Sequence, residues 1–162
     1  MVKQDWRYLL FLLAAHHPKE KIDHTIAVGV GDKKIYLCTR CTGLAFGMAA
    51  IFAVYLFGFG FSFSWYLPLI GLLPLAATAD WFTQSAGLRQ SKTSLRVGSG
   101  FLLGISEALC ILLLFNGLFL SFFVTLGMAA AYALSIYLIA RKTKCLDAYL
   151  KEMNQFAEGE LS

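Results

Sequence analysis

The sequence predicts an all-α integral membrane protein, and its composition and the arrangement of its apolar and charged residues support this class. Of the 162 residues, 58% are hydrophobic and only 15% are charged, whereas soluble domains hold roughly 45–50% apolar and about 25% charged residues. The apolar residues are concentrated in four long runs, each near the ~20 residues that a helix needs to cross a bilayer. We expect membrane lipids as partners, with oligomers an open alternative, and no nucleic acid.

The chain is expected to form a single membrane domain, 1–162, in which the four apolar runs are the transmembrane helices of a four-helix bundle over 38–140. They cover 38–57, 64–82, 97–115 and 118–140. The preceding stretch, 16–37, is polar and holds Pro18, Gly29 and Gly31, which predicts a loop.

The first 15 residues are expected to enter the membrane without crossing it. Their apolar part is short, and about eight helical residues rise only ~12 Å against ~30 Å of hydrocarbon. Asp5 and Arg7 interrupt the start, which argues against a signal peptide. We therefore predict an N-terminal re-entrant or interfacial helix over 1–15. The polar tail, 141–162, is predicted to be an amphipathic helix on the membrane surface.

The positions of the basic residues predict how the chain is oriented. With four spans and a non-spanning start, all 14 Lys and Arg residues fall on one side of the membrane. The two opposite loops, near 58–63 and 116–117, carry no charge. The positive-inside rule then predicts a multi-pass protein of the cell membrane with the 16–37 loop and both termini in the cytoplasm.

A metal site is predicted where the polar loop meets the first span. Cys38 and Cys41 are three residues apart, and two thiols at this spacing can share one tetrahedral Zn²⁺, which commonly takes Cys and His ligands. His16 and His17 are the predicted remaining ligands, with His24 or Asp80 as substitutes. Cytoplasmic thiols stay reduced, which favours zinc over a disulfide. A redox dithiol and two small residues that ease helix packing are the alternatives.

Two carboxylates stand inside the predicted spans, where a charge costs roughly 2.5–3.5 kcal/mol and marks a function or a buried partner. Asp80 is on the same side as Arg40 and Arg96, so it either pairs with one of them or acts as a ligand, acid or base. Glu107 lies deeper, and a proton-coupled role is one alternative for it. Pro74 is expected to bend the second helix.

The basic side of the membrane also offers a candidate anion site. The first and third helices both begin there, beside Arg40, Arg89 and Arg96, and helix N-termini favour anions. A phosphate-bearing lipid headgroup or a phosphorylated small molecule fits this chemistry. The alternative is an ordinary basic surface.

A short motif is repeated at the start of the first and third helices. Gly43 and Gly47 follow Thr42, as Gly100 and Gly104 follow Ser99. The Gly-x-x-x-Gly spacing lets two helix backbones approach closely. We therefore expect these two helices to touch near the cytoplasmic face, with a two-helix duplication as a further hypothesis.

As a set, these residues resemble the domain of unknown function 2085 family of small prokaryotic membrane proteins. Its archaeal branch is the more similar through the His-His-Pro start, where bacterial relatives carry Cys-His. The resemblance implies a membrane fold and a soft metal ligand at this start, but no reaction. His24 departs from the family, because similar sequences carry Arg there. The residues that carry the resemblance are His16-His17-Pro18, Tyr36 to Gly43, Asp80, Gln84, Gly87, Ser94, Arg96, Gly100 and Gly104.

The leading functional hypothesis is a metal-dependent membrane enzyme, a hydrolase or transferase. Zinc would be held by the four predicted ligands, Asp80 would be the acid/base, and Arg40 and Arg96 would bind an anionic lipid-like substrate. One alternative is a transporter or channel subunit with a structural zinc, and another is a metal- or redox-responsive scaffold.

Overall fold

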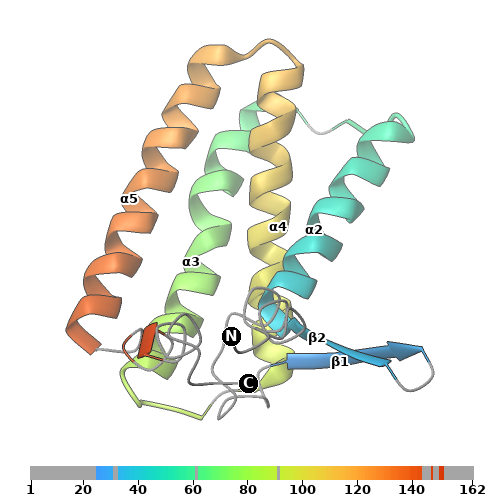
Figure 1. The fold of residues 1–162 in the computed structure, drawn as a ribbon. Helices are drawn as coiled ribbons and strands as arrows, with labels where there is room; N and C mark the ends of the chain where they lie inside the picture. Colours follow the sequence, from blue (N-terminus) through green and yellow to red (C-terminus); the bar gives the residue numbers. More distant parts are fainter. Residues whose placement is uncertain are drawn as a thin grey trace, which may run out of the picture.

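The computed structural model describes residues 25–30, 33–60, 62–90, 92–143, 147 and 150–151. Four helices lie lengthwise beside one another, and a β-hairpin lies crosswise at the end where α2 and α4 begin (Figure 1). The elements are β1 (Thr25–Val30), β2 (Lys33–Cys38), α2 (Thr39–Leu56), the 3₁₀ helix η2 (Phe63–Trp65), α3 (Tyr66–Ser85), α4 (Thr93–Phe115) and α5 (Phe119–Thr143).

Several predictions fall outside the described residues. They are the re-entrant helix over 1–15, the positions of His16, His17 and His24, and most of the tail beyond Thr143. These stay predictions.

Three of the described helices are long and apolar enough to cross a membrane: Thr39–Leu56, Thr93–Phe115 and Phe119–Lys142. The last has only 6% of its span buried by the rest of the protein. Large apolar side chains such as Leu120, 82% exposed, and Phe123, 65% exposed, therefore face outward. Such a surface is unfavourable in water and favourable in lipid. The helix α3 is the fourth member of the bundle, with 20 residues.

The expectation of a polar loop through residue 37 is wrong for the part that the structure describes. Strands β1 and β2 form an antiparallel hairpin in which Thr25 pairs with Cys38 and Val30 with Lys33. Two observations explain it. Strand β1 is rich in β-branched residues, and only Gly31-Asp32 separates the two strands in the sequence, a dipeptide typical of tight hairpin turns. The fold is thus a helical bundle with one small sheet.

The start of α4 also differs from the prediction. The helix begins at Thr93 rather than at residue 97. The prediction is based on the apolar run, and the first turn of the helix is polar, so the prediction leaves this turn out. Arg96 therefore lies inside the helix, where it is only 2% exposed.

The predicted contact between the two Gly-x-x-x-Gly motifs is confirmed. A Cβ on Gly43 would collide with the carbonyl oxygen of Val97, and a Cβ on Gly100 with that of Arg40. The contact is reciprocal: Gly43 faces the backbone three residues before Gly100, and Gly100 faces the backbone three residues before Gly43. Gly47 and Gly104 repeat it one turn further along. Helices α2 and α4 thus run parallel, with their first turns at the same level.

Pro74 joins three helices rather than only bending one. Proline has no N–H, so the carbonyl of Ile70, four residues earlier, loses its helical donor. Ser106 of α4 donates to this carbonyl oxygen at 3.1 Å, and Tyr132 of α5 donates to the next one, that of Gly71. The side chains of α4 and α5 thus satisfy carbonyls of α3 around the proline.

A glycine with positive φ lies two residues after the last residue of α2, α3 and α4: Gly58, Gly87 and Gly117. After α3, the Gly87 N–H donates to the Gln84 carbonyl at 3.1 Å and the Leu88 N–H to the Thr83 carbonyl at 3.0 Å. This pair of bonds is the Schellman motif, which requires the left-handed conformation that glycine adopts freely. The turn directs residues 88–90 back toward the end of α3.

Candidate functional site

The dithiol lies at the junction of the hairpin and the first helix. Cys38 is the last residue of β2 and directly precedes α2, and Cys41 lies in the first turn of that helix. Cys38 is buried and Cys41 is exposed. The two thiols are within hydrogen-bonding reach of each other. The structure therefore brings together two of the four predicted metal ligands.

Asp80 is held by two arginines at the same end of the bundle. Its carboxylate accepts a hydrogen bond from Arg40 of α2 on one oxygen and from Arg89 on the other. The Asp80 side chain is 5% exposed, and those of Arg40 and Arg89 are 18% and 30% exposed. Sequence reasoning left ion pairing and a direct chemical role equally open, and the structure shows the pairing. The acid/base role of Asp80 stays a hypothesis.

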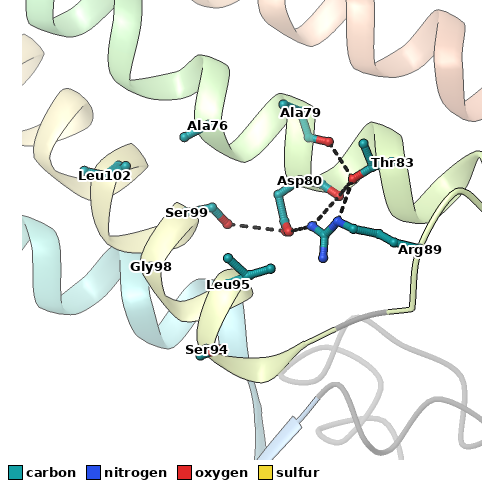
Figure 2. A pocket seen from close by; sticks show the side chains of 10 residues that line it. All are labelled: Ala76, Ala79, Asp80, Thr83, Arg89, Ser94, Leu95, Gly98, Ser99 and Leu102. Atoms are coloured by element: carbon teal, nitrogen blue, oxygen red, sulfur yellow. Dashed lines mark hydrogen bonds and ion pairs between the residues drawn. The ribbon is translucent and has the colours of Figure 1, made fainter.

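Neighbouring hydroxyl groups fix the geometry of this ion pair (Figure 2). The Arg89 Nε donates to the Thr83 hydroxyl oxygen at 2.9 Å, and that hydroxyl donates to the Asp80 carbonyl oxygen at 3.1 Å. From α4, the Ser99 hydroxyl donates to the Asp80 carboxylate at 3.4 Å. Asp80 thus links α2, α3, α4 and the loop after Gly87.

Arg96 completes the cluster from the first turn of α4. It lies beside Cys38 and within electrostatic range of Arg40 and Asp80. The described cluster then holds three guanidinium groups and one carboxylate, an excess of two positive charges in a largely buried setting. Such an excess favours an anion close by.

Two buried donors of this region have no hydrogen-bond partner within the described part of the chain. They are the Arg40 Nε and the Gln84 Nε2 atoms. Gln84 lies one turn after Asp80 on α3 and so shares its face. A buried donor without an acceptor costs about 1–3 kcal/mol, so the site offers hydrogen bonds to an acceptor-rich ligand.

The predicted zinc site is incomplete in the described residues. Within them, no three His, Cys, Asp or Glu side chains lie close enough to hold a metal ion. All three histidines are outside that range. The hairpin register nevertheless places Thr25 opposite Cys38, and His24 directly precedes Thr25 in the sequence.

Sequence reasoning missed Thr83 and Ser99 as partners of the ion pair, and it placed Arg89 only near an anion site. The Gly87 end of α3 was the available signal for Arg89, because a Schellman turn returns the chain toward the helix. Glu107 lies on an exposed face of α4. Two other polar residues of this part of the chain donate to backbone carbonyls: Ser106 to the carbonyl oxygen of Ile70 and Asn116 to that of Leu112.

Fold and site together define a small helical membrane protein with a dithiol and an arginine-rich polar cluster at one end of its bundle. The chain belongs to the family described as "Predicted membrane protein (DUF2085)", whose model matches residues 20–111. The match covers the hairpin, α2, α3 and most of α4, and so the whole described site. No curated protein and no solved structure matches the chain.

Proposed function

We propose that this protein is a zinc-binding membrane protein, with Cys38 and Cys41 as two ligands and His16 and His17 as the others. The observation that carries the proposal is the convergence of the two thiols where β2 enters α2. One buried and one exposed thiol suit a metal held at the surface of the bundle. Thiolates are ligands that Zn²⁺ prefers.

The hairpin supports His24 as the substitute ligand. His24 directly precedes Thr25 in the sequence, and Thr25 pairs with Cys38. A ligand from this side would add to the two thiols.

The number of protein ligands distinguishes an enzyme from a structural site. With three, the fourth position admits water, and zinc then supplies a hydroxide nucleophile near neutral pH. In that case Arg40 and Arg96 would orient an anionic substrate, and Asp80 would position Arg40 rather than transfer a proton. A transport path through Asp80 and Glu107 is less favoured. Asp80 is paired with two arginines, and Glu107 lies on the outer surface of the bundle.

We also propose that α3 crosses the membrane as a fourth span, with both termini in the cytoplasm. Helices α2 and α4 are parallel spans, so the chain between them has to return across the bilayer. The described Lys and Arg residues all belong to the hairpin, the start of α2, the α3–α4 loop, the start of α4, or α5 and the tail from residue 141 onward. These segments lie at the end of the bundle where α2 and α4 begin (Figure 1). The positive-inside rule places this end of the bundle in the cytoplasm.

Elemental analysis of the purified full chain tests the zinc site. We expect about one zinc per chain, reduced at least ~10-fold by Cys41→Ser or by His17→Ala. Cys41 is the sharper target because it is exposed, so its substitution leaves the packing intact. His16→Ala and His24→Ala identify the remaining ligands.

Cys110→Ser is the matched control. This thiol lies within α4 and contacts the Thr125 hydroxyl at 2.9 Å, so its loss should leave the zinc content unchanged. A wild-type chain without zinc, or one in which Cys41→Ser binds zinc normally, would overturn the proposal. A metal-free Cys38–Cys41 disulfide in protein from the reducing cytoplasm would support the redox alternative instead.

A further inference from the structure

An open cleft of about 490 Å³ lies between α3 and α4 at the charged end of the bundle (Figure 2). This volume is within the range of ~300–1,000 Å³ that is typical of ligand pockets. Small side chains create the space, among them Ala76 on α3 and Gly98 on α4. A Cβ placed on Gly98 would meet no atom within 4 Å, so the cleft is empty of side chains beside this residue.

The polarity of the cleft changes along the bundle axis. Its outer end is lined by Arg89 and Ser94, which lie in and just after the α3–α4 loop. Its inner end is lined by Ala76 and Leu102. Because a helix rises ~1.5 Å per residue, Leu102 lies about 12 Å deeper than Ser94. The cleft is therefore polar at the membrane face and apolar toward the membrane centre, as a lipid is.

Charge distinguishes this cleft from an ordinary lipid-facing groove. Asp80 and Arg89 both line it, and Arg40 and Arg96 lie close behind. Among the described residues, two guanidinium groups, those of Arg40 and Arg89, contact the single carboxylate of Asp80. This excess of positive charge favours an anionic headgroup over a zwitterionic one at the outer end of the cleft. Arg89 already donates from Nε to Thr83 and from one terminal nitrogen to Asp80. Its other terminal nitrogen, 3.5 Å from the Gln90 carbonyl oxygen, is the donor left for a phosphate oxygen.

We propose that the α3–α4 cleft binds one anionic membrane phospholipid, its phosphate against Arg89 and Ser94 and one acyl chain along Ala76, Gly98 and Leu102. The lipid enters sideways from the bilayer, because the cleft is open between the two helices. This inference goes beyond zinc binding and does not depend on it.

Native mass spectrometry of the full chain tests the proposal, with phosphatidylglycerol and phosphatidylcholine offered at equal concentration. Wild-type protein should retain phosphatidylglycerol about tenfold better. Gly98→Leu should abolish this preference, because its side chain fills the cleft without meeting the backbone. Gly127→Leu is the matched control, since Gly127 is an exposed helical glycine of α5 with equally open surroundings. Both changes favour the helix, so neither should unfold the protein.

Arg89→Gln should remove the preference between the two lipids while leaving Asp80 paired with Arg40. Equal retention of both lipids by wild type, or equal behaviour of Gly98→Leu and Gly127→Leu, would overturn the proposal. Displacement of the bound lipid by inorganic phosphate at the same concentration would also overturn it, because the acyl chain would then contribute nothing. Zinc content, measured on the same variants, should stay at the wild-type level, which separates this test from that of the dithiol.

Discussion

At the residue scale, the polar end of the bundle depends on one carboxylate. Asp80 is almost fully buried and bonds to side chains from α2, α4 and the loop after α3. A buried ion pair contributes little net stability compared with apolar packing, but removing one partner leaves the other charge buried without compensation. Asp80 therefore determines how the arginines are placed more than how stable the fold is.

Asp80→Asn should lower the free energy of unfolding by about 3 kcal/mol, the lower end of the range for breaking a buried ion pair, because Arg89 is partly exposed. Thermal or detergent-induced unfolding of the purified protein measures the effect. Glu107→Gln is the control: it also removes a carboxylate from a membrane helix, but from an exposed face, and should change stability by less than ~0.5 kcal/mol. Equal losses in the two variants would contradict a special role for the Asp80 ion pair.

At the element scale, the helices are joined by complementary irregularities. Pro74 removes a helical N–H from α3, and a serine of α4 replaces it as the donor to Ile70. Glycines of α2 and α4 leave room for each other's backbones. The proline and the glycines would each weaken an isolated helix, and in the bundle they form the contacts between neighbouring helices.

A double-mutant cycle tests this account of Pro74. Ser106→Ala should cost about 1 kcal/mol of unfolding free energy, a typical value for a hydrogen bond between membrane helices. In a Pro74→Ala background the cost should disappear, because the N–H of the new alanine donates to the Ile70 carbonyl. Ser135→Ala is the control, since that exposed hydroxyl donates to the Ala131 carbonyl oxygen of its own helix at 2.8 Å. If Ser106→Ala cost the same in both backgrounds, the proline would not be the reason for the serine.

The bundle could be predicted from the sequence because its signals are local. Apolar runs of about 20 residues predict helices, and two Gly-x-x-x-Gly motifs predict which helices touch. The hairpin was missed because glycine and lysine interrupt its strands, and the start of α4 because its first turn is polar. The pairing of Asp80 with Arg40, 40 residues away, depends on the packing of both α2 and α3 against α4. The sequence suggested this pairing only because few charged residues lie in the spans and Asp80 and Arg40 are predicted on the same side of the membrane.

At the scale of the whole molecule, the candidate sites of the described residues share one end of the bundle. The dithiol, the Asp80 cluster and the α3–α4 cleft lie where α2 and α4 begin and where α3 ends. At the opposite end, the described part of the chain has the uncharged connections at 57–65 and 116–118. Orientation in the membrane therefore decides which compartment supplies metal, reductant and lipid to the site.

Cysteine labelling of intact cells tests the proposed orientation. Ser64 and Gln90 are exposed residues at opposite ends of α3, and each can be replaced by cysteine in a chain whose four native cysteines are serine. Ser64→Cys should react with a membrane-impermeant maleimide added outside the cell, while Gln90→Cys should react only after the cells are opened. The same pair tests α3 as a span, because both positions would be labelled from one side if α3 did not cross. Labelling of Gln90→Cys alone in intact cells would invert the topology and place the dithiol outside, where thiols are prone to oxidation and a Cys38–Cys41 disulfide would replace zinc as the better proposal.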